Sequence, residues 1–410
     1  MSGSKNIPKH WQQKKLGEVC DVLDNLRKPI NSTERQQRIA GKNQSVLFPY
    51  YGATGQVGWI DDFLTDGEFI LIGEDGAPFL DSYKDKAYKI KGKTWVNNHA
   101  HILKGKKQFL INDFALFYLN SINYREFVNG TTRLKLTKSS LVEIPFVVPP
   151  LPEQQAIVEK IEELLSDLDN GKEQLQTAQQ QLKVYRQSLL KWAFEGKLIK
   201  HKGEWKKIKL GEVANAIDPQ PSHRTPPIVP NGIPYVSIKD FDSELDKIDL
   251  TNARKVSPDV LTEHLNRYTL QSGDFVIGKI GTIGKPVRVV LPQNYSLSAN
   301  IVLIQPRKIN PTYLYYFFQS NQIEKAFKAG TNATTQAAFG IQKVRELQID
   351  LPNEKEQQLI VEELESKLTI CEKIEETIGQ SLRQAETLRK SILKKAFEGK
   401  LIKTEIMAAI

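Results

Sequence analysis

The chain carries the same set of segments twice. Residues 186–200 recur at 389–403 with twelve of fifteen positions identical, and residues 153–159 recur at 356–362, both with an offset of 203. Residues 11–19 recur at 205–213 with an offset of 194. Three collinear repeats indicate a tandem duplication of about 200 residues. Each copy consists of a variable block followed by a constant block, so we expect two large modules.

The constant blocks, residues 151–200 and 351–410, are expected to form two long helices. Proline and acidic residues stand where each would begin, and Gly196 and Gly399 would cap the ends. Apolar residues recur between these limits at alternating steps of four and three, the heptad pattern of a coiled coil. In the first helix this seam comprises Ile157, Ile161, Leu164, Leu168, Leu175, Leu182, Tyr185, Leu189 and Trp192. In the second it comprises Ile360, Leu364, Leu368, Ile374, Ile378, Leu388 and Ile392.

The two seams have nearly the same register. Neither helix would be stable alone, because one face is apolar and the rest is rich in Gln, Glu and Lys. We therefore expect the two helices to pair as an antiparallel coiled coil with internal pseudo-twofold symmetry. The alternative is two separate helical hairpins, each packed on its own domain.

The variable blocks, residues 1–150 and 201–350, are expected to form two similar domains of the α/β (α+β) class. Apolar runs bounded by turn residues, at 67–73 and 273–278, predict strands. The apolar and aromatic stretches 114–119 and 313–318 predict helices. The variable blocks differ from each other far more than the constant blocks do. Two domains of one layout with different surfaces are expected to bind different things.

Glycine-containing loops in both blocks carry candidate contacts to a nucleic acid. Arg and Lys suit guanine edges and phosphates, Asn and Gln suit adenine edges, and Thr contacts phosphate or the thymine methyl group. In the first block the candidates are Thr54, Gln56, Thr131, Thr132, Arg133, Lys135 and Lys138. In the second they are Lys279, Thr282, Lys285, Thr331, Asn332, Thr334, Thr335 and Gln336. The alternative is that these are ordinary surface turns, where Gly, Thr and Asn are common.

Composition narrows the class of protein. The 57 Lys and Arg against 48 Asp and Glu give a formal charge of +9, which is compatible with a polyanionic partner but is weak evidence alone. The two cysteines, Cys20 and Cys371, cannot form a disulfide framework and suggest a reducing cytoplasm. No apolar run approaches the ~18 residues of a spanning helix, and the first residues lack an apolar segment. We therefore expect neither a transmembrane segment nor a secretory signal.

Signatures of catalysis are weak throughout the sequence. A glycine-containing segment at 278–285 resembles a phosphate-binding loop, but its spacing is wrong and Pro286 stands where Ser or Thr is required. The Asp/Asn-Pro-Pro-Tyr/Phe motif of amino-methyltransferases does not occur. His99 and His101 would share a face of a strand, but without further ligands we expect no metal site. We expect no catalytic residues in this chain.

The repeated motifs resemble the specificity subunit of type I restriction–modification systems (HsdS-like). The resemblance is carried by the Trp…Leu-Gly-Glu-Val starts at 11–19 and 205–213, the Pro-Pro-Leu-Pro-Glu-Gln-Gln segment at 149–155, and the Ala-Phe-Glu-Gly-Lys-Leu endings at 193–198 and 396–401. It covers essentially the whole chain. The opening of the second helix departs from it, because Leu351-Pro-Asn-Glu-Lys-Glu-Gln-Gln lacks one proline of the usual run.

This resemblance implies a DNA-binding subunit with two target-recognition domains, each reading one half of a bipartite sequence in double-stranded DNA. The two helices would set the spacing between the halves and dock two methyltransferase subunits, with restriction subunits joining the full complex. S-adenosylmethionine, ATP and Mg²⁺ would be bound by those partners, and adenine methylation and DNA cleavage would belong to the complex. The location would be the bacterial or archaeal cytoplasm.

Two other functions remain open from the sequence. The chain could be a coiled-coil scaffold whose domains bind protein or another ligand. It could also be a self-contained DNA nuclease or methyltransferase, although the missing methyltransferase motif argues against that. The sequence of the DNA target does not follow from the loops, because domains of one fold distinguish bases through details of loop geometry.

Overall fold

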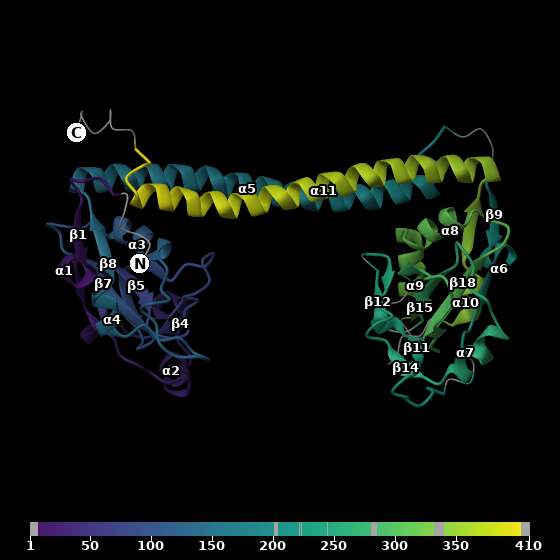
Figure 1. Cartoon of the computed structure of the whole chain (residues 1–410), viewed down its shortest axis with the longest axis horizontal. Coiled ribbons are helices and arrows are strands. Elements are labelled where there is room, and N and C mark those ends of the chain that lie inside the picture. Colours follow the sequence, from purple (N-terminus) through teal and green to yellow (C-terminus); the bar gives the residue numbers. More distant parts are fainter. Residues whose placement is uncertain are drawn as a thin grey trace. The chain divides into compact units, whose positions relative to one another are not determined.

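A computed structural model describes residues 7–200, 204–220, 222, 224–243, 245–279, 285–331 and 340–402, with only the backbone for 328–331. The chain divides into two compact units, residues 1–176 with 379–410 (unit 1) and residues 177–378 (unit 2). Each unit holds one mixed helix–strand domain and one half of each of two long helices (Figure 1). We call residues 7–150 domain 1 and residues 204–351 domain 2. The predicted mixed class is confirmed.

Domain 1 is built on a six-stranded sheet in the order β2-β7-β5-β6-β3-β4, in which only β3 and β6 run parallel. The strands are β2 (Cys20–Val22), β3 (Phe48–Gly52), β4 (Gly55–Ile60), β5 (Thr65–Gly73), β6 (Ala87–Val96) and β7 (Ala100–Gly105). A separate antiparallel pair joins β1 (Gln12–Lys15) to β8 (Pro145–Val148). The helices are α1 (Leu16–Val19), α2 (Ser32–Ile39), α3 (Asn112–Ser121) and α4 (Lys138–Val142), with short 3-10 turns η1 (Asp24–Leu26) and η2 (Gln44–Val46).

Domain 2 repeats this plan, but two smaller sheets stand in place of the six-stranded sheet. A four-stranded sheet has the order β10-β18-β15-β16, a three-stranded sheet the order β14-β11-β17, and two further pairs join β12 to β13 and β9 to β19. The strands are β9 (Lys206–Lys209), β10 (Ala214–Ile217), β11 (Ile233–Val236), β12 (Phe241–Asp242), β13 (Lys247–Ile248), β14 (Arg254–Val256), β15 (Phe275–Gly278), β16 (Pro286–Arg288), β17 (Ser296–Leu297), β18 (Ile301–Pro306) and β19 (Gln348–Leu351). The helices are α6 (Leu210–Val213), α7 (Pro258–Leu265), α8 (Pro311–Phe318), α9 (Asn321–Thr331) and α10 (Ile341–Arg345), with the 3-10 turn η3 (Ile238–Asp240).

The repeated Leu-Gly-Glu-Val motif forms a one-turn helix, α1 in domain 1 and α6 in domain 2. The Glu18 carboxylate accepts the backbone N–H of Lys15 over 2.9 Å, and Glu212 accepts that of Lys209 over the same 2.9 Å, so the acidic residue caps the turn. In domain 1 the glycine lets the turn lie against α4, since a Cβ on Gly17 would stand 2.9 Å from Cβ of Val142. The motif recurs because it closes the same corner in both domains.

The two long helices are α5 (Leu151–Phe194) and α11 (Glu354–Phe397), drawn in blue-teal and yellow-green in Figure 1. The repeated Glu-Gln-Gln places a buried glutamine at the first turn of each. Gln154 donates to the Pro149 carbonyl over 2.8 Å and accepts the N–H of Ile111 over 3.0 Å. Gln357 donates to the Pro352 carbonyl over 2.9 Å and accepts the N–H of Asn310 over 2.8 Å. One amide thus closes the helix start and ties it to its own domain.

The helix ends are anchored in the same way by a repeated phenylalanine. Phe397, at the end of α11, packs on Phe114 and Tyr118 of α3 with ring centroids 5.3 and 5.1 Å apart. Phe194, at the end of α5, packs on Tyr313 and Phe317 of α8 at 5.2 and 5.4 Å. Each domain therefore packs against the start of one long helix and the end of the other.

Gly196 and Gly399 follow the helices with φ of +70° and +68°. This left-handed conformation favours glycine, as the cap prediction required.

The helices run antiparallel where they meet inside each unit. In unit 1, Ile157 and Ile161 of α5 share a buried cluster with Ile392 and Ala396 of α11, and Lys172 lies 2.5 Å from Glu386. In unit 2, Leu189 and Phe194 share a cluster with Ile360 and Leu364. Arg186 in that unit lies 3.2 Å from Glu372 and 2.8 Å from Glu375. The pairing is therefore partly apolar and partly ionic.

The predicted seam is wrong by one residue at several positions. Ile374 and Leu388 of α11 are 44% and 51% exposed, and Tyr185 and Trp192 of α5 are 41% and 40% exposed. Their neighbours Glu375, Arg389, Arg186 and Ala193 are the less exposed residues in the two helices. Leu189, Ile378 and Ile392 of the same pattern stay buried, so the seven-residue spacing locates the pairing face without fixing every residue on it.

The other seam residues that the heptad pattern singled out are buried or half-buried. They are Ile157, Ile161, Leu164, Leu168, Leu175, Leu182, Leu189, Ile360, Leu364, Leu368, Ile378 and Ile392.

Candidate nucleic-acid interface

The loop 129–137 of domain 1 is a small closed structure. Asn129 and Lys135 exchange backbone hydrogen bonds of 3.0 and 2.8 Å, which folds the intervening residues into a tight turn. Gly130 has a φ of +106°, and a Cβ there would lie 2.5 Å from the carbonyl oxygen of Arg133. Only glycine fits this position, so the Gly130-Thr start of the loop is a geometric requirement. Thr131, Thr132 and Arg133 are exposed at its tip.

This loop is joined to the turn that follows β5, about sixty residues earlier in the chain. The N–H of Leu136 donates to the carbonyl of Glu74 over 2.7 Å, and Asp75 and Lys135 form an isolated antiparallel bridge. The N–H of Gly76 reaches the Leu134 carbonyl over 3.4 Å. These two segments and residues 97–99, where the His99 carbonyl accepts the N–H of Glu74 over 2.7 Å, form one surface, which we call the domain 1 loop surface (residues 74–76, 97–99 and 129–137).

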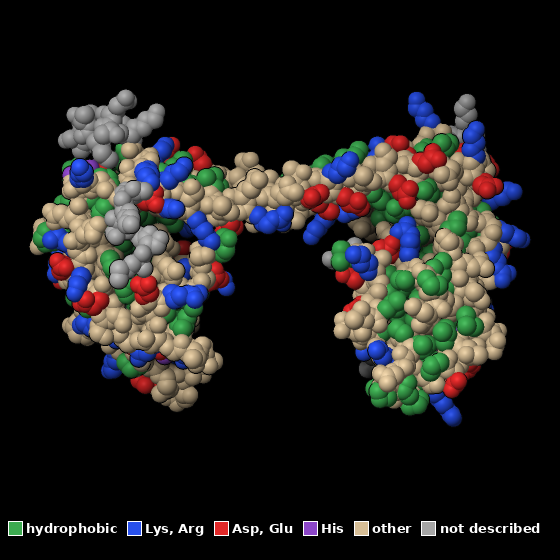
Figure 2. All heavy atoms as spheres, viewed as in Figure 1, with side chains coloured by type: hydrophobic (Ala, Val, Ile, Leu, Met, Phe, Trp, Pro, Cys, Tyr) green, Lys and Arg blue, Asp and Glu red, His purple; other side chains and the backbone are tan. Residues whose placement is uncertain are grey.

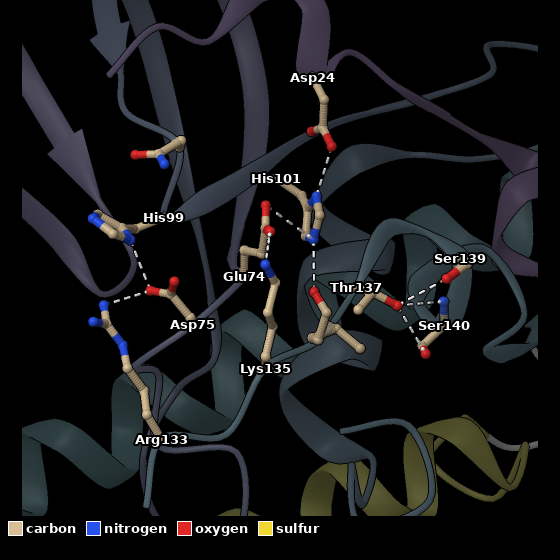
Figure 3. Close-up of polar contacts among 12 residues, drawn as sticks. Asp24, Glu74, Asp75, His99, His101, Arg133, Lys135, Thr137, Ser139 and Ser140 are labelled. Atoms are coloured by element: carbon tan, nitrogen blue, oxygen red, sulfur yellow. Dashed lines mark hydrogen bonds and ion pairs between the residues drawn. The ribbon is translucent and has the colours of Figure 1, made fainter. Parts of the chain in front are cut away.

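Two cations of the domain 1 loop surface are held by carboxylates. Arg133 Nη2 donates to Asp75 Oδ1 over 2.6 Å, and Lys135 Nζ lies 3.0 Å from Glu74 Oε1 (Figure 3). Asp75 Oδ1 also accepts a hydrogen bond from Nδ1 of His99 over 2.8 Å. The Arg133 and Lys135 side chains remain 62% and 51% exposed, whereas those of Glu74 and Asp75 are 13% and 20% exposed. The carboxylates thus lie beneath the cations.

A buried histidine supports this surface from below. His101 is fully buried, with Nδ1 2.8 Å from Asp24 Oδ2 and Nε2 2.8 Å from the carbonyl oxygen of Leu136 (Figure 3). A carbonyl can only accept, so Nε2 carries a hydrogen. Arg27 lies 3.2 Å from Asp24 and 2.5 Å from Glu74, which links the buried pair to the loop cations.

The charges of this cluster hold both inner carboxyl groups in their ionised form. Burial would raise the pKa of Asp24, but hydrogen bonding to His101 and the nearby charges of His101 and Arg27 outweigh it and lower that pKa below 3.8. Burial also opposes the ionisation of Glu74, whereas hydrogen bonds from Lys135 and Arg27 lower its pKa below 4.5. Asp24 and Glu74 therefore both carry a negative charge at neutral pH.

The remaining candidates of domain 1 lie on two other segments. Thr54 and Gln56 belong to the tight hairpin between β3 and β4, and both are exposed. The tip of this hairpin lies close to the end of β5, since a Cβ on Gly73 would stand 3.0 Å from the Ala53 carbonyl oxygen. Lys138 is exposed at the first position of α4. The fold therefore brings Thr54 near the domain 1 loop surface.

Domain 2 places a different side chain at the corresponding point. The backbone N–H of Glu74, just after β5, donates to the carbonyl oxygen of His99 over 2.7 Å. The backbone N–H of Lys279, just after β15, donates to the carbonyl oxygen of Asn300 over 2.8 Å. Glu74 and Lys279 are thus equivalent positions. Lys279 Nζ lies 3.2 Å from Asp218, and both side chains are largely buried.

The strand registers extend this correspondence. β5 and β15 pair with β7 and β18 so that Gly73 faces Ala100 and Gly278 faces Ile301. Ala100 and Ile301 are therefore equivalent, and so are the residues that follow them, His101 and Val302. β2 pairs with β7 as β10 pairs with β18, and counting along β2 and β10 from equivalent pairs makes Asp24 equivalent to Asp218.

The other candidates of domain 2 are mostly outside the described residues. Lys285 is exposed. Thr331 is the last residue of α9, known by its backbone alone. Thr282, Asn332, Thr334, Thr335 and Gln336 lie outside the described residues.

Sequence reasoning missed the carboxylates that hold the cations. Glu74 and Asp75 directly follow a buried strand, and His99 and His101 alternate on either side of the start of another. That pattern, acidic residues after one strand and histidines on its neighbour, was the available signal for a charged cluster.

Within the described part of the chain, no three His, Cys, Asp or Glu side chains form a group that could hold a metal ion. None of the helices in that part combines the length and the apolar character that crossing a membrane requires. On the face drawn in Figure 2, Lys and Arg side chains stand among Asp and Glu in both domains. Charges of both signs are therefore mixed on that face.

Comparison with known proteins agrees with the repeat. The family described as type I restriction modification DNA specificity domain matches the chain twice, over residues 8–180 and 202–384. A Haemophilus influenzae protein provisionally assigned as a type I restriction enzyme specificity subunit is 30% identical over 385 residues, which covers 91% of both chains. The EcoDI specificity subunit of Escherichia coli is 24% identical over 431 residues, covering 98% of this chain and 90% of that protein.

Solved structures share the fold. A chain from a structure of the assembly and conformational transition of the type I R-M system superposes with a TM-score of 0.70 at 18% identity, covering 97% of this chain and all (100%) of that chain. The HsdS subunit from Thermoanaerobacter tengcongensis superposes with a TM-score of 0.59 at 18% identity, covering 98% and 100%. Because the family matches both halves of the duplication, this chain belongs to the type I restriction–modification DNA specificity subunits.

Proposed function

We propose that this chain is the sequence-reading subunit of a type I restriction–modification complex and that each domain binds one half of a bipartite DNA target. The observation that carries the proposal is the contrast between the two domains. Both match the same family and share a strand register, yet equivalent positions hold Glu74 and His101 in one and Lys279 and Val302 in the other. Different groups on one scaffold are what the reading of two different half-sites requires.

The domain 1 loop surface supplies the chemistry for contact with DNA. Arg133 and Lys135 are largely exposed at a glycine-dependent turn, and an Arg guanidinium can donate two parallel hydrogen bonds to O6 and N7 of guanine. Exposed threonines at the tip, Thr131 and Thr132, suit phosphate or the thymine methyl group. In this proposal Arg133 and Lys135 distinguish bases or position the duplex, and the threonines add phosphate contacts.

The paired helices would set the distance between the half-sites and dock two methyltransferase subunits, with restriction subunits joining further out. Exposed apolar side chains in unit 2 support docking. They are Leu359, Ile370 and Ile374 on α11 and Val184, Tyr185 and Trp192 on α5. The three on α11 are spaced by eleven and four residues, which places them on one face of that helix. Large apolar side chains aligned on an exposed helix face are typical of a protein–protein interface.

In this proposal the chain itself performs no catalytic step. The partners would bind S-adenosylmethionine, ATP and Mg²⁺ and carry out adenine methylation and DNA cleavage. The complex would act on cellular DNA, and therefore in the cytoplasm of a bacterial or archaeal cell.

The test is to coexpress the chain with its methyltransferase partner and to sequence the methylated DNA of the host. We expect one bipartite motif, and we expect the purified complex to bind a duplex with that motif more tightly than either scrambled half-site. Methylation without a bipartite motif, or binding that ignores both half-sites, would contradict the proposal.

The role of the helices has its own test. One heptad inserted into both α5 and α11 adds about 10 Å of helix at ~1.5 Å per residue, which corresponds to about three base pairs at ~3.4 Å each. We expect the spacer of the methylated motif to lengthen while both half-sites stay the same. An unchanged spacer would show that the helices do not set it.

A further inference from the structure

We propose that Glu74 and Asp75 are positioning residues for DNA recognition by domain 1, and that they act by holding Lys135 and Arg133 in the orientation that meets the DNA. This inference rests on the proposed function. The two carboxylates would touch the cations and not the DNA, and they would define where the recognition groups stand before the duplex arrives.

The Asp75 carboxylate occupies only part of the Arg133 guanidinium. Asp75 takes one side of the Arg133 guanidinium through Nη2 at 2.6 Å, and a guanidinium has five N–H donors in a fixed plane. The remaining donors of a side chain that is 62% exposed are available to a second acceptor. An arginine clamped along one edge loses less rotamer entropy on binding than a free one, so the clamp strengthens a specific contact.

The carboxylates of Glu74 and Asp75 are themselves held in place by other residues of domain 1. Asp75 also accepts from His99, and Glu74 is bound by Arg27 at 2.5 Å. The backbone bridge between Asp75 and Lys135, and the bond from Leu136 to Glu74, hold the loop and the turn at one separation. Recognition groups keep a productive geometry when a second layer of hydrogen bonds fixes them.

A carboxylate can also act on DNA binding through its charge alone, and its removal would then change the affinity in the opposite direction. Two carboxylates near DNA repel its phosphates, so removing one without any positioning role should tighten binding to every sequence. If Asp75 positions Arg133, the same removal should weaken binding to the target and leave binding to unrelated DNA unchanged or tighter. The sign of the change on the target therefore distinguishes the two roles.

The experiment uses the complex of the full chain with its methyltransferase partner, and duplexes that carry the motif found by methylome sequencing or that motif with one half-site scrambled. The variants are Asp75→Asn, Arg133→Ala and the double variant. Asp66→Asn is the matched control, because Asp66 is exposed near the start of β5, and the strand from Asp66 to Gly73 is roughly 23 Å long at ~3.3 Å per residue. It removes the same charge from the same domain.

We expect Asp75→Asn to weaken binding to the target by ~5- to 100-fold, the range of one specific contact, and to lose preference at the half-site that Arg133→Ala affects. Asp66→Asn should bind as the unmodified chain does. In the Arg133→Ala background the further change Asp75→Asn should weaken binding no further, since the positioning acts through Arg133. Unchanged or tighter target binding by Asp75→Asn, or additive effects in the double variant, would overturn the inference.

Folding and function are separated by two further measurements. Thermal unfolding identifies a variant that fails to fold, and Glu74→Gln then asks the same question of Lys135. If both carboxylate variants unfold, the pair is structural and the inference is wrong. An unmodified complex that cannot distinguish the motif from scrambled DNA overturns the proposed function itself, whereas a discriminating complex that Asp75→Asn leaves intact overturns the positioning role alone.

Discussion

Domain 1 and domain 2 keep the same contacts with the long helices and differ at the ends of their central strands. Gln154 and Gln357 make the same pair of hydrogen bonds, and Phe194 and Phe397 pack on the same kind of aromatic helix. At the far end of the same scaffold, Glu74 corresponds to Lys279, so a carboxylate becomes an ammonium. The contacts with the long helices are therefore common to the two domains, whereas the charge at the strand ends differs between them.

The charged clusters at the strand ends are also organised differently. In domain 1 the aspartate Asp24 faces a buried histidine, and Arg27 links it to Glu74. In domain 2 the equivalent Asp218 pairs with Lys279 directly, and Val302 occupies the position of the histidine. An aspartate is thus retained at one position while its partner changes. The retained carboxylate can anchor either arrangement, which is a simple way to carry two surfaces on one fold.

The largest expected effect concerns the shared anchors. Phe397→Ala should destabilise domain 1 by ~3–5 kcal/mol and Phe194→Ala should destabilise domain 2 by the same amount, because each removes a buried aromatic side chain. Hydrogen exchange resolved by peptide measures both domains in each variant. Trp192→Ala, at a half-exposed position, is the control and should change little. Equal loss in both domains from either variant would show that the anchors do not act domain by domain.

Replacing His101, the buried partner of Asp24, tests the difference between the charged clusters of the two domains. His101→Val gives domain 1 the residue of domain 2 and leaves Asp24 and the Leu136 carbonyl without that donor, at a cost of ~1–3 kcal/mol. Amide exchange at Leu136, whose N–H is bonded to Glu74, should accelerate, while domain 2 stays unchanged. Unaltered exchange at Leu136 would mean that the histidine does not support the loop.

Single cations should separate specific from general contacts. Arg133→Ala should cost ~1–3 kcal/mol at one half-site only. Lys285→Ala, at an exposed position of domain 2, should weaken binding to all sequences and lower the salt slope of the affinity by ~1. Binding titrations at several salt concentrations measure both quantities. Equal losses on both scrambled duplexes for Arg133→Ala would remove the distinction between the two cations.

The smallest expected effect is a difference in pH dependence. Burial lowers the pKa of His264 in domain 2 below 6.5, so the unfolded chain takes up a proton that the folded domain refuses, and stability falls as the pH drops below 6.5. The pKa values of Asp24 and Glu74 in domain 1 are lowered, so their contribution is present above 4.5 and is lost as the pH falls through the lowered values.

Mild acid should therefore weaken domain 2 before domain 1. Unfolding monitored by hydrogen exchange between pH 7 and pH 3 provides the measurement, and His264→Gln should reduce the early loss in domain 2. Domain 1 losing stability first would contradict the assignment of these groups.

The sequence predicted the fold well where a repeat or a period expresses it. The duplicated segments located α5 and α11, and the apolar stretches located α3, α8, β5 and β15. Ile374 and Leu388 are exposed although they follow the heptad pattern, because that pattern gives the pairing face of the helix and not the packing at each position. Long periodic elements were therefore predictable, while the exact facing residue required three dimensions.

The candidate site was predictable only in its exposed half. Gly130 and the loop cations stand together in the sequence, whereas Asp75 lies 58 positions from Arg133 and meets it only because backbone hydrogen bonds join the loop to the turn after β5. His99 could be suspected from its alternation with His101, but its carboxylate partner could not. Contacts that strand pairing creates carry no local pattern, so sequence reasoning could not assign the clamp.

Each domain packs against both long helices, and this has a consequence for the order in which the domains are completed during synthesis. Domain 1 packs on Ile392 and Phe397, and Phe397 is made 221 residues after Gln176, the last residue of the first segment of unit 1. At ~5–20 residues per second, domain 1 waits roughly 10–45 s on the ribosome with the apolar surface of α3 uncovered. Domain 2 has all of its helix contacts once residue 378 is made. The first domain to be translated is thus the last to be completed, and it is the one that most needs a chaperone or an early partner during synthesis.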